Sequence, residues 1–261
     1  MPMILVTNDD GISSPGLKIL AKRLKSAGDV YVVAPETEQS AVAHALTLHR
    51  PLRAQRVRNN TFHVNGTPTD CVIIAVSKLL PQRPDLIVSG INFGANLGDD
   101  ITYSGTVAAA MEGTLLGIPS IAISLIRDDR ESSSSRKNML RFRGAADFAS
   151  SIVQKVLKKG LPEDTLLNVN VPNTADIRGV KFTRQGKLVY DNPVHERVDP
   201  RGRKYYWISG GVPRWETGED TDFDAIHKGY ISVTPVHLDL TDFGTLERMK
   251  KNWKVRERGV T

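Results

Sequence analysis

The feature of this sequence that most restricts its fold is a short apolar run, residues 3–6, that ends at two adjacent acids, Asp9 and Asp10. Apolar side chains then recur at helical spacing over residues 17–24, and a second apolar run follows at residues 30–33. A strand, a helix and a strand at this spacing form a βαβ unit, in which the two strands are parallel. The sequence therefore predicts an α/β fold with a Rossmann-like, doubly wound, mostly parallel sheet.

Later segments continue the alternation of strands and helices. Strong apolar patterns predict strands at residues 85–92, 119–125 and 166–171, one helix that begins within residues 103–107, and another over about residues 142–157. Weaker alternation at residues 47–52 and 61–64 predicts two further strands at the margin of the sheet.

Changes in residue composition and apolar pattern divide the chain into three parts. We expect an α/β catalytic core at residues 1–180, an extended hairpin arm at 181–226, and a return strand with a basic tail, 227–261, that packs on the core. Aromatic residues gather in the arm at Tyr205, Tyr206 and Trp207. Exposed aromatic side chains on a hairpin favour pairing between subunits, so a homodimer or homotetramer is predicted.

Composition limits the partners and the compartment. Lysine and arginine number 35 against 29 acids, a formal charge of +6, and the excess is concentrated in the tail at residues 248–258. The sequence contains no aromatic-interleaved basic motif, so a nucleic-acid partner is not expected. No apolar run approaches the roughly 20 residues of a membrane span. A single cysteine, Cys71, suits a reducing compartment, and we expect a cytoplasmic protein that does not contact membranes.

Polar side chains follow several predicted strands at the points where those strands end. Asp9 and Asp10 follow the first strand, Gly11 permits a turn there, Ser40 lies in the loop after the second strand, and Asn92 ends a later one. Ligands of open parallel sheets bind beyond the carboxyl ends of the strands. Oxygen donors without thiolate or imidazole favour a hard cation such as Mg²⁺ or Mn²⁺. The simpler alternative is that the acid pair is an ordinary polar turn.

The triplet Ser104, Gly105 and Thr106 opens a predicted helix. Its small residues leave backbone amides and hydroxyls free to meet an anion, and the helix dipole adds to the attraction, which is typical of a phosphate cradle. The same triplet serves equally well as a plain N-cap.

Read in order, these stretches resemble the SurE family of metal-dependent 5′/3′-nucleotidases. The resemblance is carried by residues 6–12, 33–35 with Ser40, 66–72, 89–92 and 103–107. It implies that nucleoside 5′- or 3′-monophosphates are the substrates and that dimers or tetramers form through an extended C-terminal arm. It also implies a ligand set for one divalent cation per subunit, formed by Asp9, Asp10, Ser40 and Asn92. The phosphate pocket is then lined by Asn96, Ser104, Gly105 and Thr106.

The residues also suggest how such a reaction would proceed. A phosphate monoester resists attack because its negative oxygens repel a nucleophile. A bound cation neutralises this charge and lowers the pKa of a coordinated water. We therefore expect metal-bound water to attack phosphorus in line, with Asp9 and Asp10 as the catalytic residues and residues 104–106 holding the non-bridging oxygens. The sequence leaves open whether Asp10 acts as a nucleophile or as a general base.

Two other classes of protein share parts of this pattern. A receiver-like signalling domain also holds Mg²⁺ with acids after its first strand, but it needs an aspartate after the third strand and a lysine after a later one. Here these positions are occupied by Asn92 and by Ile126 and Arg127. A basic nucleic-acid-binding protein with an incidental acid pair would show salt-sensitive binding and no metal-dependent turnover.

Overall fold

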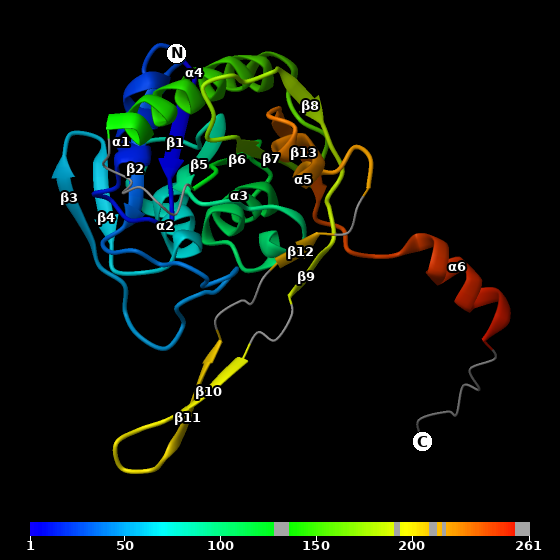
Figure 1. The fold of residues 1–261 in the computed structure, drawn as a ribbon. Coiled ribbons are helices and arrows are strands. Elements are labelled where there is room, and N and C mark those ends of the chain that lie inside the picture. The colour runs from blue at the N-terminus through cyan, green and yellow to red at the C-terminus, as the bar shows by residue number, and fades with distance from the viewer. Residues whose placement is uncertain (128–135, 191–193, 209–212, 216–217, 254–261) are drawn as a thin grey trace, which may run out of the picture.

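The structure is a computed structural model that describes residues 1–127, 136–190, 194–208, 213–215 and 218–253. Its centre is a nine-stranded sheet in the order β3-β4-β2-β1-β5-β6-β7-β13-β8 (Figure 1). Six of the neighbouring pairs are parallel, and β3–β4 and β13–β7 are antiparallel. The predicted mostly parallel sheet is therefore confirmed. The strands are β1 (Met3–Thr7), β2 (Asp29–Pro35), β3 (Ala54–Arg58), β4 (Thr61–Val64), β5 (Leu86–Phe93), β6 (Ser120–Leu125), β7 (Thr165–Val171), β8 (Val180–Phe182) and β13 (Ile231–His237).

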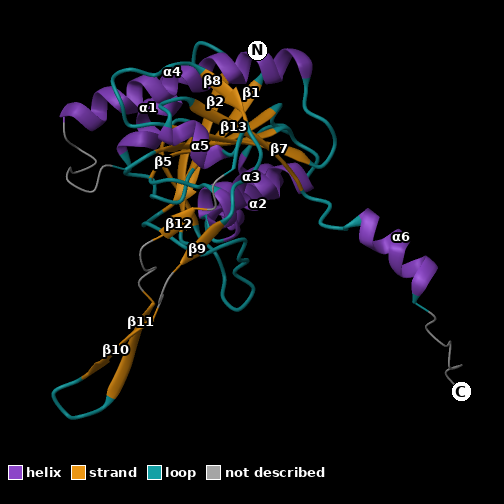
Figure 2. Cartoon of the chain, turned by 45° about the vertical axis from the view of Figure 1, so that its right-hand side comes forward, coloured by secondary structure: helices purple, strands orange, loops and turns teal. Residues whose placement is uncertain are grey.

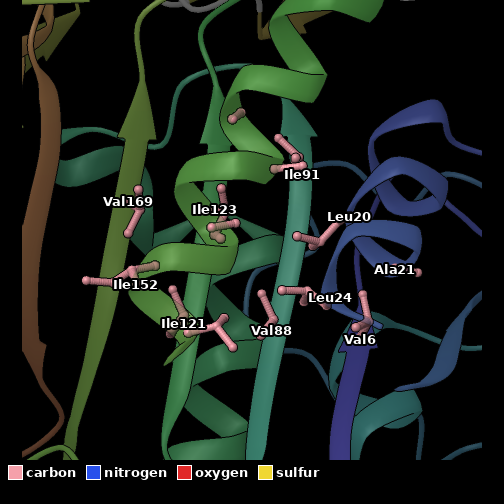
Figure 3. Close-up of a cluster of buried hydrophobic side chains, with 14 of the residues drawn as sticks. Val6, Leu20, Ala21, Leu24, Val88, Ile91, Ile121, Ile123, Ile152 and Val169 are labelled. Carbon is pink, nitrogen blue, oxygen red and sulfur yellow. The ribbon is translucent and has the colours of Figure 1, made fainter. Parts of the chain in front are cut away.

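Helices cover both faces of this sheet. On one face, α1 (Pro15–Leu24) and α4 (Arg136–Lys159) enclose the larger core. Figure 3 shows Leu20 and Leu24 of α1 and Ile152 of α4 over Val88 and Ile121 of the strands. On the other face, α2 (Pro68–Ile74), a π-helical turn (Ala75–Leu79) and α3 (Gly105–Leu115) enclose a second core. The sheet is thus doubly wound, as predicted.

One predicted strand is absent from its expected place. Residues 47–52 form a loop, and the marginal strand β3 lies a few residues later, at Ala54–Arg58. The Thr47 amide donates to Asp70 Oδ1 (3.0 Å), a side chain at the start of α2, so it does not enter a sheet ladder. The alternation of residues 47–52 therefore did not reflect strand pairing.

The arm also differs from its predicted boundaries. β8, at its predicted start, pairs with β13 and belongs to the main sheet, while α5 (Asp222–His227) contacts β13. Between them, β9 (Leu188–Tyr190) pairs with β12 (Pro213–Trp215), and β10 (Val194–Val198) pairs with β11 (Lys204–Ile208). Both views show the β10–β11 hairpin extending away from the sheet (Figures 1 and 2).

The predicted packing of the C-terminal tail on the core is wrong for the described part of the tail. The return strand is present as β13, but α6 (Phe243–Asn252) has no buried residue and points away from the sheet (Figures 1 and 2). Its apolar side chains, including Phe243 at 60% exposure, are not covered by any of the described residues. Residues 254–261 lie outside the described part.

No helix among the described residues combines the length and apolar character needed to cross a membrane.

Candidate metal and phosphate site

A cavity of about 280 Å³ lies at the carboxyl edge of the sheet, where β1, β2 and β5 end and α3 begins. Most of the predicted site residues line it, although they are spread over almost 100 positions of the sequence. The predicted residues at this cavity are Asp9, Asp10, Ser40, Asn92, Asn96 and Ser104. The remaining two, Gly105 and Thr106, lie directly against Asp9.

The turn that carries the acid pair is fixed from within. Asn8 is fully buried, and its Nδ2 donates to the Gly11 carbonyl (3.1 Å) and to Ser14 Oγ (3.0 Å). Gly11 has φ +87°, in the left-handed region that favours glycine, so the chain can reverse there. Ser14 then caps α1 by accepting from the Leu17 amide. The stretch therefore forms the polar turn of the simpler alternative, and its acids also line the cavity, where metal binding stays a prediction.

Asp9 is held by the first turn of α3. Its Oδ1 accepts a hydrogen bond from the Thr106 hydroxyl, and an added Cβ on Gly105 would lie 2.9 Å from Asp9 Cβ. Only glycine allows the helix to approach this closely. Burial raises the pKa of Asp9, and the hydrogen bonds from Thr106 act against that rise.

Asp10 is the more accessible acid of the pair. Its Oδ2 accepts a hydrogen bond from the Phe93 amide at the end of β5 (3.3 Å). Burial raises the pKa of Asp10 to about 7, and the charge of Asp9 beside it adds to the rise. The charged groups that raise the two pKa values are themselves acids, Glu38 and, for Asp10, Asp9. A bound cation would therefore stabilise the ionised forms of both carboxylates.

Ser40 and Asn92 present oxygen atoms to the same cavity. Ser40 Oγ donates to Glu38 Oε1 (2.6 Å), so its lone pairs are free to face another partner. Asn92 Nδ2 donates to the Gly94 carbonyl (3.0 Å), which fixes the amide and leaves its Oδ1 available. Two carboxylates, a hydroxyl and an amide oxygen fit a hard divalent cation. No three His, Cys, Asp or Glu side chains of the described residues converge on a metal position, so this set depends on the neutral oxygens.

The predicted phosphate-binding residues divide into two kinds. Asn96 and Ser104 line the cavity, although the Ser104 hydroxyl also accepts from the Val107 amide (3.1 Å) and so caps α3. Thr106 is fully buried and its hydroxyl is directed to Asp9, so its side chain supports the acid pair. The Ser104 side chain is therefore an N-cap, and the phosphate cradle stays a prediction.

Sequence reasoning missed four lining residues with polar side chains: Glu38, Asp100, Tyr103 and Arg127. Glu38 lies two positions before Ser40, in the loop after β2. Its closeness in sequence to Ser40 was the only feature that could have predicted its place in the site. Arg127 also borders a larger cavity of about 900 Å³ along the same edge. That cavity has a single acid, Asp176, among Arg178, His227 and Lys228, so it does not suit a divalent cation.

The fold and the cavity define a doubly wound α/β protein with paired carboxylates beyond its first strand. A family model described as Survival protein SurE matches residues 4–192. A protein named 5′-nucleotidase SurE from Syntrophotalea carbinolica is 54% identical over 249 residues, which are 95% of this chain and 96% of that protein. One with the same name from Geobacter metallireducens is 50% identical over 256 residues, covering 97% and 98%.

A solved structure supports the same assignment. The crystal structure of a SurE protein from Aquifex aeolicus has 46% sequence identity and a TM-score of 0.83, and the match covers 96% of this chain and 99% of that one. The chain therefore belongs to the SurE family.

Proposed function

We propose that this chain is a 5′-nucleotidase, a phosphoric monoester hydrolase that converts nucleoside 5′-monophosphates, and 3′-monophosphates as well, to nucleoside and inorganic phosphate. The observation that carries the proposal is that the acid pair, Asp9 and Asp10, lines one cavity together with the neutral oxygen donors Ser40 and Asn92. The names of the relatives agree with it. One divalent cation per subunit, Mg²⁺ or Mn²⁺, completes the proposal.

Asp9, Asp10, Ser40 and Asn92 would hold this cation. When bound, it would neutralise phosphate charge and activate a water for in-line attack. Asp9 is held in position by Thr106 and Gly105, and Asp10 by the Phe93 amide, so both carboxylates are oriented before any ligand arrives. Such preorganisation removes the cost of ordering the site during the reaction.

The phosphate would lie between the acid pair and the start of α3. Asn96 and Ser104 line the cavity, Gly105 and Thr106 form the first turn of α3, and the α3 N-terminus attracts negative charge. The side chains of Asn96 and Ser104 and the first backbone amides of α3 would then meet the non-bridging oxygens, while the Thr106 hydroxyl remains with Asp9.

Phosphate release from a panel of nucleoside monophosphates, with Mn²⁺, Mg²⁺ or a chelator, tests the activity. We expect turnover with either metal and none with the chelator. Asp9→Asn and Asp10→Asn should abolish turnover in folded protein. Asp29→Asn is the matched control, because Asp29 is exposed at the opposite, amino end of β2. Absence of release with every metal and substrate would contradict the proposed function.

Direct attack by water can be distinguished from attack by an aspartate. With a ³²P-labelled monophosphate and an acid quench, the direct mechanism leaves no label on the protein. An acyl-phosphate trapped on Asp9 or Asp10 would show that the carboxylate is the nucleophile.

We further propose a homodimer or homotetramer in the cytoplasm. The exposed aromatics of β11, Tyr206 at 60% and Trp207 at 63%, and the uncovered α6 supply apolar surface for subunit contacts. Light scattering should give two or four times the chain mass of 28.7 kDa, and a monomer would contradict this part. Cell fractionation tests the location, which the single buried cysteine Cys71 favours.

A further inference from the structure

The backbone of Asn96 is held by side chains from a distant strand. The Asn96 amide donates to Asn170 Oδ1 (2.9 Å), and the Asn96 carbonyl accepts from Asn170 Nδ2 and from Asn168 Nδ2 (both 2.8 Å). The side chain of Asn96 donates through Nδ2 to Ser124 Oγ (2.7 Å). Both backbone polar groups of Asn96 and one end of its amide are therefore held by β6 and β7.

These partners occupy positions where a sheet of this kind normally has apolar side chains. Asn168, Asn170 and Ser124 are at most 1% exposed, and the two asparagines share one face of β7 with the core residue Leu166. Burying an amide costs free energy unless its polar atoms are bonded. Asn168 Oδ1 has no hydrogen-bond partner among the described residues, so one such cost is left uncompensated. Apolar side chains at positions 168 and 170, like those of Leu167 and Val169 on the other face of β7, would avoid this cost.

We infer that Asn168, Asn170 and Ser124 are positioning residues that hold Asn96 for binding of the substrate phosphate. The inference rests on the proposed function and extends it to residues outside the cavity. Ser124 fixes the orientation of the Asn96 side-chain amide. The two asparagines of β7 fix the position of the Asn96 backbone at the edge of the sheet. A bound phosphate would then meet a side chain that is already ordered.

The side chains of the proposed metal ligands are held by other partners. Asn92 Nδ2 is bonded to the Gly94 carbonyl, Asp9 to Thr106, and Asp10 to Phe93. Asn92 also lies opposite Ser124 in the β5–β6 ladder, a backbone pairing that a change of the Ser124 side chain keeps. Loss of the network should therefore weaken phosphate binding and leave metal binding unchanged. A residue with a merely structural role would change both together, or neither.

The test uses Ser124→Ala, with Ser124→Thr as the variant that keeps the hydroxyl. The matched control is Ser120→Ala, in the same strand and on the same face, because the buried Ser120 hydroxyl donates only to the Ile118 carbonyl (2.9 Å). Inorganic phosphate is the probe, measured as a product inhibitor and by calorimetric titration with Mn²⁺ present. Metal binding is titrated separately without phosphate.

For Ser124→Ala, we expect the phosphate inhibition constant and the KM to rise about five- to tenfold, as for loss of one hydrogen bond. The Mn²⁺ affinity of the variant should stay within about twofold of the wild-type value, because sites without shared partners respond to mutation almost independently. Ser124→Thr should restore phosphate binding, and Ser120→Ala should change neither constant. Asn170→Ala, which removes two of the bonds, should have the larger effect.

Two results would overturn the inference. The first is an unchanged phosphate constant in folded Ser124→Ala and Asn170→Ala. The second is a parallel loss of phosphate and metal affinity. An inactive wild-type protein would instead contradict the proposed function, and it would be recognised before any variant is compared.

Discussion

The hydroxyl of Thr106, in the first turn of α3, donates a hydrogen bond to Oδ1 of Asp9 at the end of β1, across 97 positions of the sequence. This bond joins the acid pair to the helix that would meet the phosphate, and it satisfies one oxygen of a buried carboxylate. The orientation of Asp9 is therefore set by a residue that was itself predicted to bind phosphate.

Replacement of Thr106 by valine should weaken metal binding and lower kcat about tenfold or more, because Asp9 loses its donor while the shape of the site is kept. Thr106→Ser should recover most of the loss. Thr114→Val is the control, since Thr114 lies on the same helix and its hydroxyl donates only to the Ala110 carbonyl. Equal effects of the two valine variants would contradict the role assigned to Thr106.

Gly105→Ala should reduce activity strongly without unfolding the protein. The new Cβ would lie 2.9 Å from Asp9 Cβ and 3.1 Å from Asp9 Oδ2, so either Asp9 or α3 must move. Gly144→Ala is the matched control, because Gly144 is exposed in α4 with nothing within 4 Å of an added Cβ. That control should be fully active and more stable by about 0.5–1 kcal/mol. Phosphate release and urea unfolding measure both effects, and a fully active Gly105→Ala would show that the close approach is dispensable.

Glu38→Ala should lower the apparent affinity for Mn²⁺ by about tenfold or more. Glu38 Oε1 accepts a hydrogen bond from the Ser40 hydroxyl (2.6 Å) and so orients the proposed hydroxyl ligand. Loss of such an outer partner typically lowers metal affinity by that amount. Glu36→Ala, in the same loop and exposed, should leave the affinity unchanged. The measurement is the Mn²⁺ dependence of phosphate release. Identical curves for the two variants would remove Glu38 from the site.

The metal-free protein should become more stable as the pH falls from about 8 to about 5, with the window set by the two pKa values of Asp10. In the folded chain its pKa is about 7, against the ordinary 3.8, so folding favours the protonated form. The folded state then gains a proton that the unfolded chain does not bind until lower pH. Below about pH 4 the unfolded chain binds it as well, and the gain from Asp10 is complete.

Urea midpoints measured with a chelator present, for wild type and Asp10→Asn, test this dependence. The variant should be more stable than wild type at pH 8, and the difference between the two should shrink toward pH 5. A constant difference over this range would mean that Asp10 carries no such shift.

Much of the core could be predicted from the sequence. Periodic apolar residues reflect local structure, and they predicted several elements correctly. These are the strands at residues 85–92, 119–125 and 166–171 and the helices that follow β1 and β5. Oxygen-bearing residues at strand ends were brought to one cavity because the carboxyl ends of parallel strands meet at the same sheet edge. For the same reason, the sequence alone was enough to place the acid pair at this edge.

The sequence by itself determined the βαβ start, the parallel sheet and the edge at which Asp9 and Asp10 lie, since these follow from local spacing. Only the tertiary structure decided what each hydroxyl and amide does there. Thr106 supports Asp9, and Asn168 and Asn170 support Asn96, through bonds that span 72 or more positions. It also decided that α6, among the described residues, buries no side chain. Such contacts depend on which distant strands become neighbours, and no local pattern of residue types encodes that pairing.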